Sequence, residues 1–220
     1  MLKIVIFDSG YGGEFLADRF EEEIYVVDII RVIDWRHADI YLNKPKTSRK
    51  YALEALRPYI GKVDLIIIAN QLLSATSLKY FSRTFPEQRF IGLELKTPDT
   101  FIDRGTIILT TKALTKTMEY HGFIFRLKRR VETITVDSWL EKIDNGDLSP
   151  TEINQTLTRF CFEHRISPQE VILGCSQLED IRSELKKIFG RNLKIYSSFD
   201  DTIRKACKIL RIRGGIGRKS

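Results

Sequence analysis

Apolar and polar positions along this chain form blocks of two kinds. Short apolar runs, typical of buried strands, recur between longer stretches in which apolar residues stand three or four positions apart, as on one face of a helix. Strands alternating with helices of about 10–15 residues predict parallel sheets with helical crossovers. The predicted strands are 2–7, about 25–34, 65–69, 89–94, 106–111, 131–138, 170–174 and 192–196. The first predicted helix begins near Glu14. The other predicted helices cover 48–60, 74–85, 112–123, 151–164, 178–189 and 200–210.

The same order of elements starts again in the second half of the chain, after a polar crossover at 96–105. We therefore expect an α/β fold of two pseudo-symmetric lobes, each a mainly parallel sheet flanked by helices, with the site in the cleft between them. The first lobe is expected to hold residues 1–92 plus 194–220, and the second residues 93–193. The polar stretches 35–48 and 140–150 are predicted loops, with Ser48 as the N-cap of the following helix.

Three of the apolar runs end in a small residue or a turn and then become polar. The carboxyl ends of parallel strands are where open α/β sheets build their sites, so these turns are the candidate site. Two of the runs differ in chemistry: Cys175 follows the run VILG, whereas Asn70 follows the run LIIIA. The three runs are IVIFDSGYGG with Asp8 and Ser9, LIIIANQLLSA with Asn70 and Gln71, and VILGCSQLED with Cys175, Ser176 and Gln177.

The net charge of +7 and the pI of about 9.3 come partly from basic residues near 126–130 and in the tail RIRGGIGRKS. No aromatic residues that could stack on bases interleave with these clusters. Charge alone is weak evidence for a nucleic-acid partner. We therefore interpret the clusters as solvated surface and expect nucleic acid not to be a partner.

Cysteine and histidine usage argues against a metal site. The three cysteines are an odd number with no CxxC or Cys/His ligand spacing, which favours a reducing cytoplasm and no metal. Cys161 and Cys207 occupy apolar helical positions and are expected in the core, whereas His37, His121 and His164 are expected on the surface or in loops. No apolar run approaches the roughly 20 residues that a membrane helix needs, and no secretory pattern opens the chain.

The motifs, taken in order, resemble those of the cofactor-independent aspartate/glutamate racemase superfamily, and its glutamate racemase branch most closely. The start IVIFDSGYGG is similar to the family's FDSGxGG, and IYLN, with Tyr41, stands where the family carries its PYG turn. ILTTKALTKTMEY at 108–120 is similar to the strand and helix of the second lobe. KIDNG, with Asp144, resembles an acidic VExG turn, and VILGCS resembles the second cysteine motif, GCTH.

The resemblance implies a racemase that needs neither pyridoxal phosphate nor a metal. In that family one thiolate removes the α-proton of an amino acid while a thiol on the opposite face delivers one, and D-glutamate for peptidoglycan is the product. The family often forms homodimers. Chemistry agrees with the role of a cysteine, because a helix N-terminus lowers a thiol pKa, and Cys175 stands between a strand and the helix predicted from Leu178.

The sequence departs from the family where the chemistry is most sensitive. The first cysteine motif, ACNTAS in the family, reads ANQLLS, so Asn70 replaces the first catalytic cysteine. An amide cannot exchange a proton at neutral pH as a thiol does. Gln71 and Leu72 replace the asparagine and threonine that follow, and Gln177 replaces a histidine. Leu114 stands at a substrate-binding threonine, and Asp34 is matched only loosely to a family aspartate.

These residues predict an enzyme acting at the Cα of a small amino acid or dicarboxylate, with one-sided chemistry. Cys175 is the expected acid/base, tuned by Asp8. The residues expected to hold the substrate are Ser9, Tyr41, Asn70, Gln71, Asp144, Ser176 and Gln177. Two alternatives stay open: a catalytically silent binding protein that kept the fold, and a decarboxylase or isomerase that works with a single cysteine.

Overall fold

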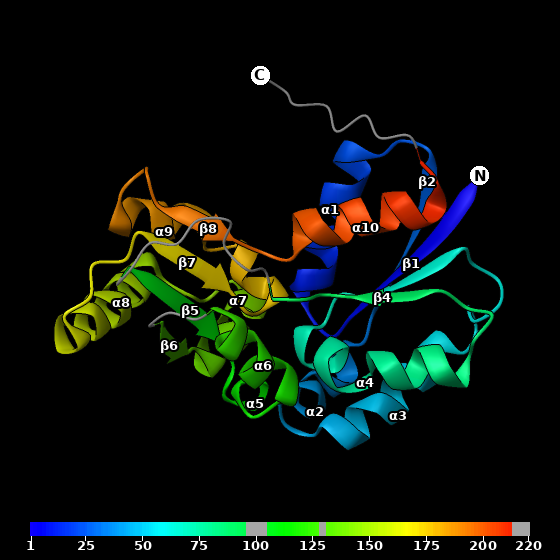
Figure 1. Cartoon of the computed structure of the whole chain (residues 1–220), viewed down its shortest axis with the longest axis horizontal. Helices are drawn as coiled ribbons and strands as arrows, with labels where there is room; N and C mark the ends of the chain where they lie inside the picture. The colour runs from blue at the N-terminus through cyan, green and yellow to red at the C-terminus, as the bar shows by residue number, and fades with distance from the viewer. Residues whose placement is uncertain (96–104, 128–130, 213–220) are drawn as a thin grey trace. The chain divides into compact units, whose positions relative to one another are not determined.

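The computed structural model describes residues 1–95, 105–127 and 131–212. The chain divides into two compact units: residues 1–94 with the C-terminal segment from Ser198, and the segment from Leu95 to Ser197. Each unit contains one four-stranded sheet in which all neighbouring strands run parallel, flanked by helices (Figure 1). The predicted α/β fold of two lobes is confirmed. The predicted crossover at 96–104, the basic residues 128–130 and the tail from 213 lie outside the described residues.

The sheet of the first unit has the order β2-β1-β3-β4. Its strands are β1 (Leu2–Asp8), β2 (Val27–Ile33), β3 (Leu65–Ile68) and β4 (Phe90–Gly92). Its helices are α1 (Tyr11–Glu23), η1 (Trp35–His37), α2 (Ala38–Asn43), α3 (Pro45–Leu56), α4 (Gln71–Thr84) and α10 (Phe199–Leu210). The central strands β1 and β3 are almost continuously aliphatic, as expected of strands with helices on both faces.

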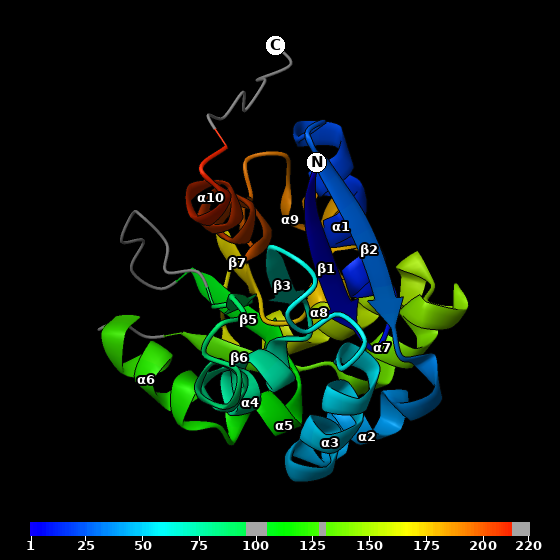
Figure 2. The same cartoon turned by 90° about the vertical axis from the view of Figure 1, so that its right-hand side faces the viewer.

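Alternate residues of β1 face two separate apolar cores. Ile4 and Ile6 pack in a core that includes Leu16 and Phe20 of α1 and Ile203 of α10. Val5 and Phe7 pack in the other core, with side chains of α2, α3 and α4. Because side chains alternate along a strand, this pattern places α1 and α10 on one face of the sheet and α2–α4 on the other (Figures 1 and 2).

The second unit repeats the plan with the strand order β6-β5-β7-β8. Its strands are β5 (Thr106–Thr110), β6 (Glu132–Thr135), β7 (Glu170–Leu173) and β8 (Lys194–Tyr196). Its helices are α5 (Lys112–Thr115), α6 (Met118–Leu127), α7 (Asp137–Asn145), α8 (Pro150–His164), η2 (Ser176–Glu179) and α9 (Arg182–Phe189). In both units a central strand, β1 or β5, pairs with neighbours on each side, and Asp8, Asn70 and Cys175 lie at or just after the ends of central strands.

The predicted loop at 35–48 is wrong, because helices occupy nearly all of it. Pro45 opens α3, a position that suits proline since the first helical N–H needs no intrahelical partner. Ser48 is therefore not an N-cap: it is buried inside α3, and its hydroxyl donates to the carbonyl oxygens of Ile40 at 2.9 Å and Lys44 at 2.8 Å.

The predicted loop at 140–150 is also wrong over its first half, which belongs to α7. Trp139, Leu140 and Ile143 are buried at helical spacing. Gly146, at φ 73°, ends the helix in the left-handed conformation, so the Asn-Gly pair is a helix C-cap rather than a free turn. The predicted helix 178–189 is divided into the short η2 and α9, and the predicted helix 112–123 into α5 and α6.

Cys161 and Cys207 are only half-buried, which corrects the expectation that both lie in the core. Burial still raises the pKa of both thiols above the ordinary value. Within the described ranges, no helix is both long and apolar enough to span a bilayer, and no group of three acidic, cysteine or histidine side chains is arranged to hold a metal ion.

Candidate active site

The turn after β1 buries a carboxylate. Asp8 ends the strand and is completely buried, and its Oδ1 accepts a hydrogen bond from the backbone N–H of Ser9 at 2.7 Å. Gly13 in α1 lies directly over it, since a Cβ there would stand 2.6 Å from the Cβ of Asp8 and 2.9 Å from Ile33. Only glycine allows the first turn of α1 to approach the strand end this closely.

Asn70, at the end of β3, uses its side chain within the first unit. Its Oδ1 accepts from the backbone N–H of Leu73 at 2.9 Å, which makes it the N-cap of α4. Its Nδ2 donates to the Oγ of Ser9 at 3.0 Å and to Oδ1 of Asp8 at 3.3 Å. The amide has one acceptor atom and two N–H donors, so all of them have partners. Asn70 therefore ties the turn after β3 to the turn after β1.

Tyr41 is held by Asp34, the residue that follows β2. Tyr41 is 1% exposed, and its hydroxyl donates to Oδ2 of Asp34 at 2.9 Å. Burial, aided by the bond to Asp34, raises the pKa of Tyr41 well above its ordinary range, so the phenol stays protonated. Nδ1 of His37 lies 2.9 Å from the same oxygen, and its ring stacks on Tyr51 at 3.7 Å between centroids.

A backbone hydrogen bond links Asp34, the partner of Tyr41, to Asp8: the N–H of Asp34 donates to the carbonyl oxygen of Asp8 at 2.9 Å. His37 is half-buried and ordered by these contacts, which differs from the loop position expected for it. Gln71, the first residue of α4, is buried and accepts a long hydrogen bond of 3.5 Å from the hydroxyl of Ser198. Asp8, Ser9 and Asn70 thus form one cluster, with Tyr41 and Gln71 engaged by other partners.

The corresponding turn of the second unit carries the thiol. Cys175 is 8% exposed and directly precedes η2. η2 has only four residues, so the long helix expected to start beside the cysteine is a single 3-10 turn. Ser176 and Gln177 are buried next to it, and the Oγ of Ser176 donates to Oε1 of Gln177 at 3.3 Å.

Gly174 fixes the approach of this turn to β5. A Cβ at Gly174 would lie 2.7 Å from both the Cβ and the Oγ1 of Thr110, and 2.9 Å from the carbonyl oxygen of Leu109. The absence of a side chain therefore lets the strand end before Cys175 pack directly against the end of β5.

Thr110 is a candidate that the sequence did not indicate. It ends β5 as Asp8 ends β1, it is completely buried, and among the described residues its hydroxyl is the buried side-chain polar atom without a hydrogen-bond partner. An unpaired buried hydroxyl costs about 1–3 kcal/mol, so native structures rarely keep one without a reason. The sequence signal that could have indicated Thr110 is its place near the end of the predicted strand TIILTT, which corresponds to the place of Asp8 in the first half of the chain.

Asp144 lies in the last turn of α7 and is half-buried. α7 packs against η2, so Asp144 belongs to the same neighbourhood of helices as Cys175. Of the predicted site residues, the first unit therefore holds Asp8, Ser9, Tyr41, Asn70 and Gln71, and the second holds Asp144, Cys175, Ser176 and Gln177.

No protein-family model matches the chain. Among curated proteins, the chain is 26% identical to the glutamate racemase of Campylobacter jejuni over 213 residues, covering 90% of this chain and 82% of that protein. It is 21% identical to the glutamate racemase of a Sulfurovum species over 223 residues, covering 97% and 84%. The crystal structure of Escherichia coli glutamate racemase with L-glutamate and the activator UDP-MurNAc-Ala superposes with a TM-score of 0.81 at 19% identity, covering 97% of this chain and 84% of that one.

These similarities run over nearly the whole chain and agree with the order of motifs and strands. The chain has the fold of the glutamate racemases, and its sequence similarity supports a place in the aspartate/glutamate racemase superfamily, with the glutamate racemases as its relatives.

Proposed function

We propose that this protein is a cofactor-independent enzyme of the racemase type that exchanges the α-proton of a small amino acid or dicarboxylate from one face. Cys175 is the acid/base, and Asn70 stands at the position where the resemblance implies the opposing thiol. The observation that carries the proposal is the hydrogen bonding of Asn70. Each polar atom of its side chain has a partner in the first unit, and an amide does not exchange protons near neutral pH.

Cysteine is a suitable residue for this reaction. The α-proton of an amino acid is very weakly acidic, so the site must stabilise a carbanion-like state with positioned donors and little water. Cys175 is nearly buried and follows a strand end in a turn of polar residues. Asp8 tunes the electrostatics of the site, and Ser9, Gln71, Ser176 and Gln177 together with backbone N–H groups of the turns bind carboxylates.

Two leucines make the expected pocket more apolar than in the family. Leu72, in the first turn of α4, and Leu114, in α5, are both buried and stand where the resemblance implies threonines. A charged ammonium group is costly to bury without polar partners. Glutamate is therefore expected to be a weaker substrate here than in its relatives, and D-glutamate for peptidoglycan is the product if the family role is kept.

The test is α-proton exchange in D2O. L- and D-glutamate and L- and D-aspartate are incubated with the protein, and the Cα proton signal and the optical rotation are followed together, with Cys175→Ala as the control. Exchange of one enantiomer without inversion, lost in Cys175→Ala, supports the proposal. Equal exchange and inversion of both enantiomers would contradict one-sided chemistry.

The second candidate is a catalytically silent binding protein. The full use of Asn70 within the fold favours it as well, since that network needs no substrate. The two candidates differ at the thiol. A catalytic Cys175 is alkylated faster than the other two cysteines and is protected by a bound dicarboxylate, whereas a binding protein that lost catalysis exchanges none of the four amino acids and shows no selective alkylation.

A further inference from the structure

Charge is distributed unevenly over the first unit. Residues 1–34 contain three Lys or Arg and eight Asp or Glu, whereas residues 35–89 contain ten Lys or Arg and four Asp or Glu. The two segments supply opposite sides of one sheet, because α1 covers one face and α2, α3 and α4 cover the other. Residues 35–89, which include α2, α3 and α4, therefore have an excess of positive charge, whereas residues 1–34 have an excess of negative charge.

Four basic side chains on the α1 and α10 side lie within ion-pair distance of carboxylates. Arg31 contacts three of them, with distances of 2.8 Å to Glu14, Asp18 and Glu21. Arg19 lies 2.8 Å from Glu23 and 2.7 Å from Asp200. Two further pairs complete this set: Lys205 with Glu94, and Arg204 with Asp201.

Basic side chains on the opposite side are mostly unpaired. Five exposed residues, which we call the α3–α4 basic face, are Lys46, Lys50, Arg57, Lys79 and Arg83. Lys50 lies 3.9 Å from Glu54 in a highly exposed pair, and the other four have no ion pair within the described residues. Helical spacing aligns them, since Lys46 and Lys50, and likewise Lys79 and Arg83, are four residues apart on their helices.

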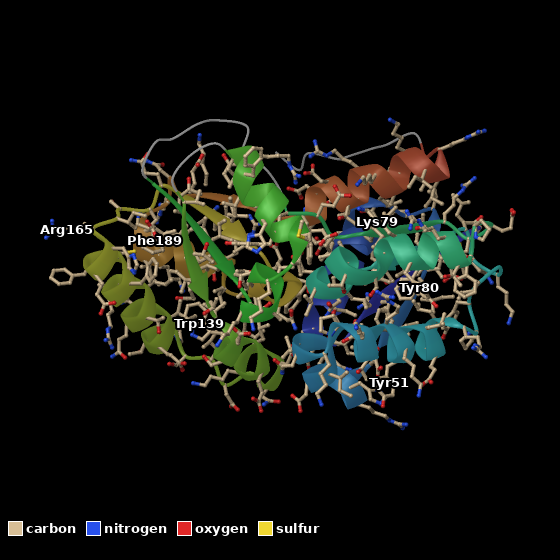
Figure 3. All side chains as sticks on the ribbon, turned by 60° about the horizontal axis from the view of Figure 1, so that its bottom comes forward. Tyr51, Lys79, Tyr80, Trp139, Arg165 and Phe189 are labelled. Carbon is tan, nitrogen blue, oxygen red and sulfur yellow. The ribbon has the colours of Figure 1, made fainter. Side chains whose placement is uncertain are left out.

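The two helices are held together as one surface. Arg49 of α3 donates to the carbonyl oxygen of Thr76 at 3.1 Å and to the Oγ of Ser77 at 3.3 Å, and its guanidinium lies 4.5 Å from the ring centroid of Tyr80. Figure 3 shows Lys79 and Tyr80 on α4 and Tyr51 on the adjacent α3. Arg49 covers one face of the Tyr80 ring and His37 stacks on one face of the Tyr51 ring, although Tyr80 is still 39% exposed.

We propose that the α3–α4 basic face binds the phosphate backbone of duplex nucleic acid without reading its sequence. Unpaired lysines and arginines in aligned rows neutralise phosphates and release counterions, which drives such binding. A single strand, which binds by stacking, would find one face of each tyrosine ring already covered. An acidic protein fits less well, because protein interfaces are depleted in lysine and enriched in exposed aromatic anchors. The proposal departs from the expectation, drawn from the basic sequence clusters, that nucleic acid is not a partner, because the residues of this face come from two helices separated by β3.

The test measures binding of a fluorescently labelled duplex of about 30 base pairs by anisotropy between about 50 and 200 mM salt. The variant Lys46→Gln/Lys50→Gln/Lys79→Gln/Arg83→Gln removes four charges from the face. The matched control Lys116→Gln/Lys186→Gln/Arg191→Gln/Lys208→Gln removes four exposed charges elsewhere. Circular dichroism melting confirms that both variants fold, and the readout does not depend on catalysis.

We expect the first variant to lose on the order of 10²-fold in affinity at about 100 mM salt and to reduce the salt slope by about 3 to 4, with the control variant close to the parent protein. Equal losses in both variants would overturn the proposal in favour of a general effect of net charge. Absence of duplex binding at about 50 mM salt, or tighter binding of an acidic polypeptide or of a single strand than of the duplex, would also overturn it.

Discussion

The turn that follows β3 and the turn that follows β7 occupy equivalent places in the two sheets, yet they use their polar groups differently. In the first unit, Asn70 caps α4 and bonds to Ser9 and Asp8, so the turn is closed by its own hydrogen bonds. In the second unit, Cys175 precedes a single 3-10 turn, and the neighbouring strand ends in Thr110 with an unpartnered hydroxyl. Under the proposed function, the turn after β3 serves stability and the turn after β7 serves chemistry.

Asn70, at the position where the resemblance implies a cysteine, does more in the first unit than leave out a thiol. An N-cap contributes about 1 kcal/mol, and the bonds from Asn70 to Ser9 and Asp8 add to it. The first unit thus gains stability at the position where a second thiol would be needed. The predictions below separate these two roles, starting with the largest expected effect.

Removal of the Cys175 thiol should abolish most of the activity but change the stability of the fold little. We expect Cys175→Ala to lower the rate of α-proton exchange by about 10²- to 10⁴-fold, the usual contribution of a positioned acid/base. The midpoint of thermal unfolding should change little. Cys161→Ala and Cys207→Ala are the controls, and the comparison fails if either of them lowers exchange as much as Cys175→Ala does.

Removal of the Asn70 amide should instead lower the stability of the fold. Asn70→Ala loses the cap of α4 and two donors to buried oxygens, so we expect the free energy of unfolding to fall by about 2–3 kcal/mol. Urea denaturation measures it. A loss no greater than that of Cys175→Ala would mean that the Asn70 network does not stabilise the first unit.

Two threonines of β5 provide a matched pair within the second unit. Both are completely buried, but the hydroxyl of Thr106 donates to Oε2 of Glu170 at 2.8 Å, whereas that of Thr110 has no partner. We expect Thr106→Val to cost about 1–3 kcal/mol and Thr110→Val to be neutral or stabilising by up to about 1 kcal/mol. If Thr110→Val lowers the free energy of unfolding as much as Thr106→Val does, the hydroxyl of Thr110 has a hydrogen-bond partner in the folded protein.

The pKa shifts of the other thiols predict a smaller, kinetic difference. Burial raises the pKa of Cys161 and, together with the nearby Glu23, that of Cys207. A raised pKa means a smaller thiolate fraction at a given pH, so at about pH 8 both should react with iodoacetamide a few-fold more slowly than a free cysteine. Their rates should still be rising with pH above the ordinary thiol pKa. Mass spectrometry of the peptides follows each site, and a rate for either that levels off below that pKa would contradict the shift.

Much of the fold could be predicted from the sequence because strand and helix periods are local properties. The buried runs at Leu2–Asp8, Leu65–Ile68 and Glu170–Leu173 were predicted nearly to the residue. The helices at 35–48 were missed because Pro45 and its polar neighbours have weak periodicity, and α3 is stabilised by packing against the sheet. Asn-Gly at 145–146 was interpreted as a loop, although the same pair ends a helix equally well.

The sequence indicates candidate site residues but not the hydrogen bonds that they form. Asp8, Asn70 and Cys175 stand out because each follows an apolar run. Which atoms Asn70 bonds to, and that Tyr41 is engaged by Asp34, depend on contacts between segments far apart in sequence. Thr110 was missed for the same reason, since an unpartnered hydroxyl is a property of its surroundings and not of its residue type.

The most direct test of one-sided chemistry places a thiol at position 70, where the resemblance implies one. Asn70→Cys, compared with the parent protein and with Asn70→Cys/Cys175→Ala, is assayed for α-proton exchange and inversion of both glutamate enantiomers in D2O. We predict that the parent protein exchanges without inverting, that Asn70→Cys gains inversion while losing about 2 kcal/mol of stability, and that the double variant loses inversion. Inversion by the parent protein at the rate of Asn70→Cys would contradict the claim that Asn70 makes the chemistry one-sided.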